Sequence, residues 1–121
     1  MTRPKTPKKG DVYWIDSNPV PGMESQNKHR FIVITPKKIN ELGIVMTIPV
    51  ASGGILSKNM GLTVPILGYN TEGIAVCNQI RSFDISTRVQ LGTARYIETL
   101  DEDLSSEIVN RVLSVIEPSM E

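Results

Sequence analysis

The sequence has few of the residues on which several common kinds of site depend. Its single cysteine, Cys77, cannot form an internal disulfide and leaves no cysteine cluster for zinc. A lone thiol of this kind fits a reducing compartment, so we expect a cytoplasmic protein. The apolar runs are only as long as a strand, and no membrane span is expected. The basic N-terminus is followed by no apolar stretch, so no secretory signal is expected either.

Motifs for cofactor or metal chemistry are also missing. The chain has no phosphate-binding loop, no dinucleotide fingerprint, no nucleophile elbow and no Cys/His metal spacing. We therefore expect no cofactor and no metal. The only histidine, His29, stands among polar residues, where a solvated side chain is commoner than a general base. Aromatic residues make up only 5% of the chain, and we expect Tyr13 and Trp14 to serve the core rather than a stacking platform.

The net charge is zero, which at first argues against a nucleic-acid partner. The chain carries 13 Lys+Arg and 13 Asp+Glu. Residues 1–100 hold 12 basic and 7 acidic residues, a balance of +5, whereas residues 101–121 hold 1 basic and 6 acidic residues, a balance of −5. The neutrality is a cancellation between a basic body and an acidic C-terminus. Since the position of the charges decides such binding, an RNA partner stays open.

A length of 121 residues with 40% hydrophobic residues supports one domain. Residues 1–9 are basic and contain two prolines, which predicts a flexible arm before a single domain over 10–121. β-Branched and apolar runs predict short strands, and they are listed here: 11–15, 31–35, 44–50, 62–66, 73–78, 80–85 and 93–97.

Two helices complete the prediction. Residues 37–42 can form a short helix that Gly43 ends. Thr99 and Glu102 match a capping box, followed by a buried helical stripe that contains Leu104 and Ile108. The fold class is therefore mostly β (α+β), a small twisted β-barrel or half-barrel with a short helix and a C-terminal helix.

Two long loops, 17–29 and 51–61, are expected to carry function, because long loops without structure of their own are uncommon in compact domains. The end of the first loop and the residue after it concentrate carboxylate, amide and cationic groups: Glu24, Gln26, Asn27, Lys28, His29 and Arg30. These residues form either a solvated loop or an anion site, because guanidinium forks suit phosphate oxygens. The residues alone favour neither interpretation.

The order of several short motifs resembles one family, the MazF/PemK/Kid toxins of bacterial toxin–antitoxin systems, and most of all its ChpB branch. The resemblance covers residues 10 to about 116. The motifs that carry it are Gly10-Asp11-Val12-Tyr13-Trp14, Pro21-Gly22-Met23-Glu24-Ser25-Gln26, Arg30-Phe31-Ile32-Val33-Ile34-Thr35-Pro36, Ile48-Pro49-Val50-Ala51-Ser52-Gly53-Gly54, Gly73-Ile74-Ala75-Val76-Cys77-Asn78-Gln79-Ile80-Arg81 and Asp84.

The resemblance implies an SH3-like barrel, a homodimer and an acidic cognate antitoxin. It also implies a metal-independent endoribonuclease that cleaves single-stranded mRNA at short sequences and so inhibits growth. Attack of the RNA's own 2′-hydroxyl on the adjacent phosphate would give a 2′,3′-cyclic phosphate and a 5′-hydroxyl. Arg30 matches the family's catalytic arginine, which would hold the phosphate and stabilise its developing charge.

The chain departs from the family pattern at several positions, of which Phe31, in place of the usual proline, matters mainly for packing. The usual threonine of the second loop is Ala51 here, so Ser52 carries the remaining hydroxyl and is our candidate for its role. Met23 stands where several members have histidine, and Val76 and Asn78 stand where the Kid branch has arginine and aspartate. Acid–base work would therefore fall on Glu24, His29 or Arg30, and we take Arg30, Ser52 and Glu24 as the candidate catalytic residues.

Candidate RNA-binding residues are those with a positive charge or a base-reading amide in the two long loops and in a third cluster after the 73–78 strand begins. They are Gln26, Lys28, His29, Lys58, Asn78, Gln79 and Arg81. Two alternatives stay open: a non-enzymatic gyrase poison of CcdB type on the same kind of fold, and a catalytically weakened RNA-binding toxin. Arg30 with Glu24, and the pair Asn78 and Gln79, favour the nuclease.

Overall fold

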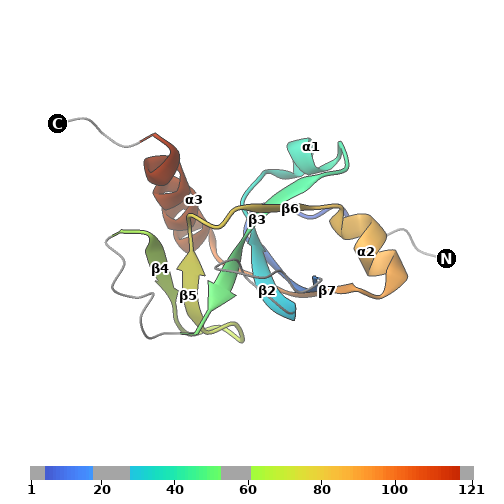
Figure 1. The fold of residues 1–121 in the computed structure, drawn as a ribbon, viewed down its shortest axis with the longest axis horizontal. Coiled ribbons are helices and arrows are strands. Elements are labelled where there is room, and N and C mark those ends of the chain that lie inside the picture. The colour runs from blue at the N-terminus through green and yellow to red at the C-terminus, as the bar shows by residue number, and fades with distance from the viewer. Residues whose placement is uncertain (1–4, 18–27, 53–60, 118–121) are drawn as a thin grey trace.

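An antiparallel sheet forms the body of the molecule in a computed structural model that describes residues 5–17, 28–52 and 61–117. The elements in chain order are β1 (Asp11–Asp16), β2 (Lys28–Val33), α1 (Lys37–Asn40), β3 (Val45–Ala51), β4 (Thr63–Ile66), β5 (Gly73–Val76), β6 (Arg81–Phe83), α2 (Ile85–Leu91), β7 (Ala94–Thr99) and α3 (Glu102–Ile116). Figure 1 shows α3 on the side of β4 and β5, with α2 at the opposite end of the sheet. Among the described residues, no helix is both long and apolar enough to cross a bilayer.

Strand β3 is the centre of the sheet. It pairs with β2 along one edge, while its first half pairs with β6 and its last residues pair with β5 along the other edge. The strand order is β4-β5-β3-β2-β1-β7, and no pairing joins the end strands β4 and β7 within the described ranges. The prediction of a mostly β chain with a C-terminal helix is confirmed. The sheet is not closed among the described residues, so the predicted SH3-like barrel is not confirmed.

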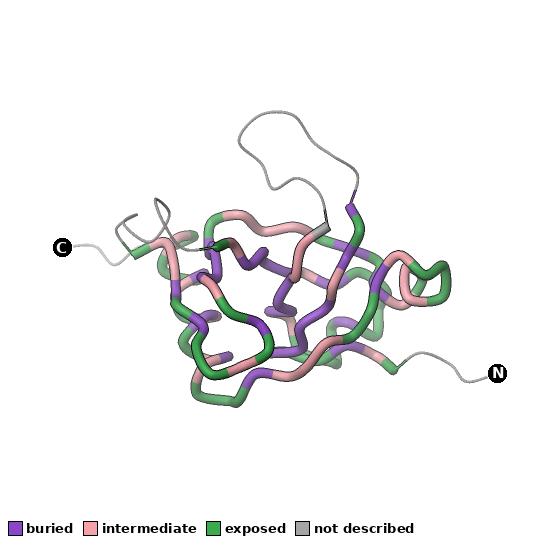
Figure 2. Tube along the Cα trace, turned by 90° about the horizontal axis from the view of Figure 1, so that it is seen from below, coloured by how far each residue is buried: buried purple, intermediate pink, exposed green. Residues whose placement is uncertain are grey.

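The two faces of the sheet are both apolar, because successive strand residues point to opposite sides. Val12 and Ile32 face one core, which α3 covers with Ile108 and Val112. The alternate residues belong to a second core that reaches α2: Tyr13, Ile15, Phe31, Val33, Val45, Phe83, Ile85 and Ala94. Figure 2 shows the buried positions gathered toward the middle of the molecule and the exposed positions along its outer turns. A strand residue therefore faces either the α3 side or the α2 side according to its parity.

Two helix starts differ from the sequence prediction. Thr99 is the last residue of β7, and its hydroxyl donates to Asp11 Oδ1 at 2.7 Å, so the predicted capping box is wrong. Asp101 caps α3 instead, and its side chain accepts from the amide of Leu104 at 2.8 Å. The sequence prediction also lacked α2, which Asp84 caps by accepting from the amide of Thr87 at 3.1 Å. Both caps are aspartates, which compete well with threonine for this role.

The start of β2 is the difference that matters most for function. The sequence predicted a loop through His29, but β2 begins at Lys28 and pairs with β1. Lys28 lies opposite Asp16, His29 opposite Ile15, and Arg30 opposite Trp14. His29 and Arg30 are therefore held by a strand ladder rather than by a loop.

Part of the basic arm lies among the described residues. Pro7 is buried, and its carbonyl oxygen accepts from Asn40 Nδ2 at 2.8 Å. The amide of Lys8 donates to Asp11 Oδ2 at 3.0 Å. The division into an arm over 1–9 and a domain over 10–121 stays a prediction.

Candidate functional site

A hollow of about 420 Å³ lies where β1, β2 and the end of β3 meet the turn before β5. The residues that line it are Trp14, His29, Arg30, Val50, Ala51, Ser52 and Glu72. Three residues predicted from the sequence thus come together here, namely Arg30, Ser52 and His29. His29 and Arg30 belong to β2, and Ser52 follows β3. Arg30 and Ser52 are 22 positions apart in the sequence.

The strand pattern explains why this end of the sheet is open and polar. Ile34, Ile32 and Arg30 alternate along one side of the chain, and the two isoleucines lie in the core under α3. Val12 and Trp14 repeat the same step on β1, from fully buried to half-buried. The apolar face of the sheet therefore continues into the hollow, where its next residues are an arginine and a tryptophan.

Arg30 is held by the turn between β4 and β5. Its Nη1 donates to the carbonyl oxygen of Asn70 at 2.9 Å and to Thr71 Oγ1 at 3.0 Å. Thr71 is fully buried, whereas Arg30 is half-buried. Both acceptors are neutral oxygens, so the two bonds orient the guanidinium without cancelling its charge. A guanidinium held in this way can bind an anion in the hollow, such as an RNA phosphate.

Trp14 has a different position from the one expected. Tyr13 is buried in the α2-side core, where burial and the nearby Asp11 carboxylate raise its pKa to about 12. Trp14 is half-buried, lines the hollow, and lies under the guanidinium of Arg95, 5.3 Å from the ring centroid. The alternation of β1 separates the two aromatic residues, and only Tyr13 serves the core.

Arg81 is not brought to the hollow. Its guanidinium lies 5.0 Å from the centroid of the Phe83 ring and 5.9 Å from that of Phe31, against the α2-side core. Its Nη1 is buried and has no hydrogen-bond partner in the part of the chain that the structure describes. Arg30 belongs to the α3 side of the sheet, so the two arginines occupy opposite faces. A shared phosphate-binding surface for Arg30 and Arg81 is therefore not supported.

Asn78 and Gln79 lie in the turn between β5 and β6, outside the lining of the hollow. Asn78 is exposed, and the backbone N–H of Gln79 donates to the carbonyl oxygen of Val76 at 3.3 Å. The remaining predicted residues, Glu24, Gln26 and Lys58, lie outside the described residues, as does the side chain of Lys28. Their roles stay predictions.

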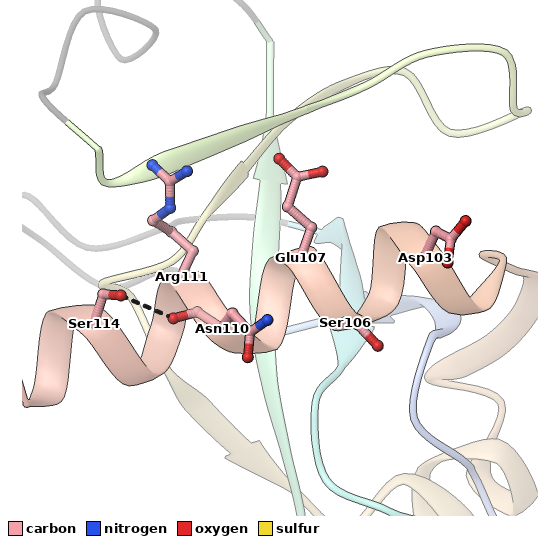
Figure 3. A pocket seen from close by; sticks show the side chains of 6 residues that line it. All are labelled: Asp103, Ser106, Glu107, Asn110, Arg111 and Ser114. Atoms are coloured by element: carbon pink, nitrogen blue, oxygen red, sulfur yellow. Dashed lines mark hydrogen bonds between the residues drawn. The ribbon is translucent and has the colours of Figure 1, made fainter.

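A second hollow runs along α3 and contains none of the predicted residues. It measures about 450 Å³ and is lined by Asp103, Ser106, Glu107, Asn110, Arg111 and Ser114. Figure 3 shows Glu107 and Arg111 pointing from the helix toward β4, and Arg111 Nη1 donates to the carbonyl oxygen of Gly61 at 3.0 Å. Its lining comes from one helix and is mainly hydroxyl, amide and acidic. Over the described ranges, no group of three or more His, Cys, Asp or Glu side chains is placed to hold a metal ion.

Comparison with known proteins decides the family. The model described as PemK-like, MazF-like toxin of type II toxin-antitoxin system matches residues 8–116. The chain belongs to this family. The family member is similar to the endoribonuclease PemK of Escherichia coli, with 24% identity over 111 residues, which are 89% of this chain and 80% of the relative. It is also similar to the endoribonuclease toxin ChpB of Escherichia coli (strain K12), with 26% identity over 112 residues, 90% of this chain and 93% of the relative.

Solved structures support the fold of this family member. It resembles the crystal structure of MazF (Form-I) from Deinococcus radiodurans with a TM-score of 0.77 and 21% identity, over 93% of this chain and 98% of that one. The MazE-MazF structure (Form-II) from the same organism gives a TM-score of 0.74 and 21% identity, over 96% and 100%. The resemblance stated from the sequence motifs is thus confirmed at the level of the family.

Proposed function

We propose that this family member is the toxin of a type II toxin–antitoxin system and cleaves single-stranded mRNA. The activity is supported by the endoribonuclease relatives PemK and ChpB. The observation that carries the proposal is Arg30, whose charged guanidinium is oriented by two neutral oxygens at the wall of an open hollow. A cytoplasmic place of action follows from the proposed substrate.

The proposed reaction needs no protein nucleophile and no metal. The 2′-oxygen of the RNA attacks the adjacent phosphorus, the bond from phosphorus to the 5′-oxygen breaks, and the products are a 2′,3′-cyclic phosphate and a 5′-hydroxyl. Negative charge grows on the phosphate oxygens as the new bond forms. Arg30 stabilises that charge, and Ser52, which is exposed at the same hollow, donates a hydrogen bond to a phosphate oxygen.

Two side chains are proposed for acid–base transfer. Glu24, which lies outside the described residues, is the proposed proton acceptor for the 2′-hydroxyl. His29 lines the hollow and is the proposed donor of the proton that the departing 5′-oxygen takes up. Glu72 adds an exposed carboxylate to the same lining, which the sequence motifs did not single out. A guanidinium is a poor base because it does not lose its proton in proteins, so the role of Arg30 is electrostatic.

The proposal also covers assembly. We propose that the protein forms a homodimer and that it binds an acidic cognate antitoxin, as the family resemblance implies. Solved relatives in Deinococcus radiodurans comprise MazE-MazF structures, which supports an antitoxin as partner. An acidic antitoxin would suit a basic RNA-binding surface, because the two would compete for the same positive charges.

The decisive experiment is cleavage of a long RNA by the purified protein in EDTA, with sequencing of the product 5′ ends. We expect cuts at a shared short sequence, 5′-hydroxyl ends, and a rate loss of about 10²–10³-fold for Arg30→Ala. Ser52→Ala should reduce the rate less, by up to about tenfold, since one neutral hydrogen bond is lost. Intact RNA after prolonged incubation, or full activity of Arg30→Ala, would overturn the proposal.

A further inference from the structure

Glu98 contacts the turn that holds Arg30. Its Oε2 accepts from the backbone N–H of Thr71 at 2.6 Å, and its Oε1 accepts from the backbone N–H of Asn70 at 3.2 Å. The carbonyl of Asn70 and the hydroxyl of Thr71 are the two groups that accept from Arg30. One carboxylate on β7 therefore fixes both residues whose oxygens orient the guanidinium.

A β-bulge brings Glu98 to this side of the sheet. In the pairing of β1 with β7, Val12 lies opposite Glu98 and Trp14 opposite Arg95, with a register shift between Val12 and Tyr13. Glu98 and Arg95 are three residues apart and would face opposite sides of a regular strand. The extra residue restores both to the side of Val12 and Trp14, which is the side of the hollow. Bulges are common next to active sites because they re-aim a side chain in this way.

A second contact anchors the same turn. The hydroxyl of Tyr69 donates to Asp101 Oδ2 at 2.7 Å and accepts from the Asp101 amide at 3.0 Å. Asp101 also caps α3. Three successive residues of the turn are thus tied to the segment from the end of β7 to the start of α3. The turn that holds Arg30 is therefore itself anchored by Glu98 and Asp101.

We propose that Glu98 and Thr71 are positioning residues for Arg30 in RNA cleavage, with Glu98 acting through the Asn70–Thr71 turn. The inference rests on the proposed function, because it assigns these residues to the same reaction. Glu98 does not touch the reacting phosphate. It holds the amides of the turn, the turn holds the guanidinium, and the guanidinium is then in place before the charge on the phosphate develops.

The test is a set of matched variants assayed for kcat at saturating RNA and for thermal unfolding. Thr71→Val removes the hydroxyl at nearly constant shape and should lower kcat about tenfold, whereas Thr71→Ser keeps the hydroxyl and should restore most of it. Glu98→Ala should lower kcat by a similar factor, and Glu98→Gln, which keeps one acceptor oxygen, by less. Glu41→Ala, an exposed glutamate at the end of α1, is the control and should cleave normally.

A double-mutant cycle separates positioning from a general structural role. In an Arg30→Ala background, Thr71→Val should cause little further loss, because the group it positions is gone. In ¹⁵N spectra, Glu98→Ala should shift the Asn70 and Thr71 amides and the Arg30 Nε–H signal, while Glu41→Ala should leave them in place. If Glu98→Ala fails to fold, Glu98→Gln and the Thr71 pair carry the same test.

The outcomes are distinguishable from failure of the proposed function. If Arg30→Ala is inactive but Glu98→Ala and Thr71→Val cleave at the normal rate, the positioning inference is wrong and the ribonuclease stands. If the unmodified protein leaves RNA intact, the proposed ribonuclease is wrong. In that case the spectra still test the positioning role. An unchanged Arg30 Nε–H signal in Glu98→Ala would overturn it, and a shifted signal would support Glu98 as a positioning residue for Arg30 in binding another anion.

Discussion

At the scale of single residues, the alternation along β1 and β2 decides which side chains serve the core and which serve the site. Tyr13 and Phe31 pack in the α2-side core, whereas their neighbours Trp14 and Arg30 line the hollow. A change of one register position would exchange these roles, because the side chains of a strand alternate between faces. The identity of Arg30 matters for chemistry, and its position in the ladder matters equally.

Cys77 gives a test of burial at this scale. The side chain is fully buried, and burial raises its pKa from 9.0 to about 11. At pH 8 only about one thiol in a thousand would be ionised in the folded state, and the thiolate is the reactive form. We expect Ellman's reagent to label Cys77 very slowly in the native protein and rapidly in denaturant.

The sign of the pH effect on stability follows from the same shift. Because the folded state holds the thiol proton to higher pH than the unfolded state, the Cys77 contribution to the free energy of unfolding falls as pH rises from about 9 toward 11. Fast labelling of the native protein at pH 8 would contradict the buried position.

At the scale of elements, close approach of β3 and β5 sets the wall of the hollow. Gly73 begins β5 with φ +142°, and a Cβ there would lie 2.3 Å from the carbonyl oxygen of Ala51, which lines the hollow. A separation this short cannot be relieved by a side-chain rotation, since the contacted atom belongs to the backbone. The sheet geometry next to Ser52 therefore depends on the absence of a side chain at Gly73.

We expect Gly73→Ala to destabilise the fold by on the order of 1–3 kcal/mol, and to reduce RNA cleavage as well. Gly92→Ala is the matched control. Gly92 also has a positive φ, of 82°, but a Cβ there would meet nothing within 4 Å, and the residue ends α2 away from the hollow. Denaturant unfolding of both variants, with cleavage assayed well below the transition, checks the difference. Equal cleavage by the two variants would contradict the dependence of the sheet geometry next to Ser52 on Gly73.

At the scale of the whole molecule, four arginines of the described residues lie on two different sides of the sheet. Arg30 and Arg95 lie on the hollow's side of the sheet, whereas Arg81 and Arg88 lie with their guanidinium groups over the Phe83 ring. The positive charge of these four arginines is therefore divided between two faces. An RNA strand held at the hollow would sense only part of that charge.

The salt dependence of RNA binding measures this division. Each phosphate contact to single-stranded nucleic acid contributes about −0.7 to the slope of log K against log salt concentration. With a 2′-O-methyl RNA, which offers no attacking hydroxyl, we expect Arg30→Met to make the slope shallower by about 0.7. Arg81→Met should leave the slope unchanged. Fluorescence anisotropy over a series of salt concentrations provides the measurement, and an equal change for Arg81→Met would show that RNA reaches both faces.

Local rules predicted most elements but not their boundaries. The β-branched and apolar runs indicated every strand, because burial in a sheet favours such residues. They left His29 in a loop, since a strand of Lys28, His29 and Arg30 has no apolar signature and exists only through its pairing with β1. The missed helix α2 had a readable signal in Asp84 and Gly92, its N-cap and left-handed C-cap.

The sequence by itself determined the family, the mostly β fold class with a C-terminal helix, and Arg30 as the candidate catalytic residue, since short motifs in a shared order carry that information. Only the tertiary structure decided which residues surround Arg30. Thr71 contacts Arg30 from the turn before β5, and Glu98 holds that turn from β7. A register shift in the pairing of β1 with β7 turns Glu98 to the side of the hollow. The same structure separated Arg81 from Arg30 by placing them on opposite faces. Such relations depend on which strands pair and in which register, which no local pattern encodes.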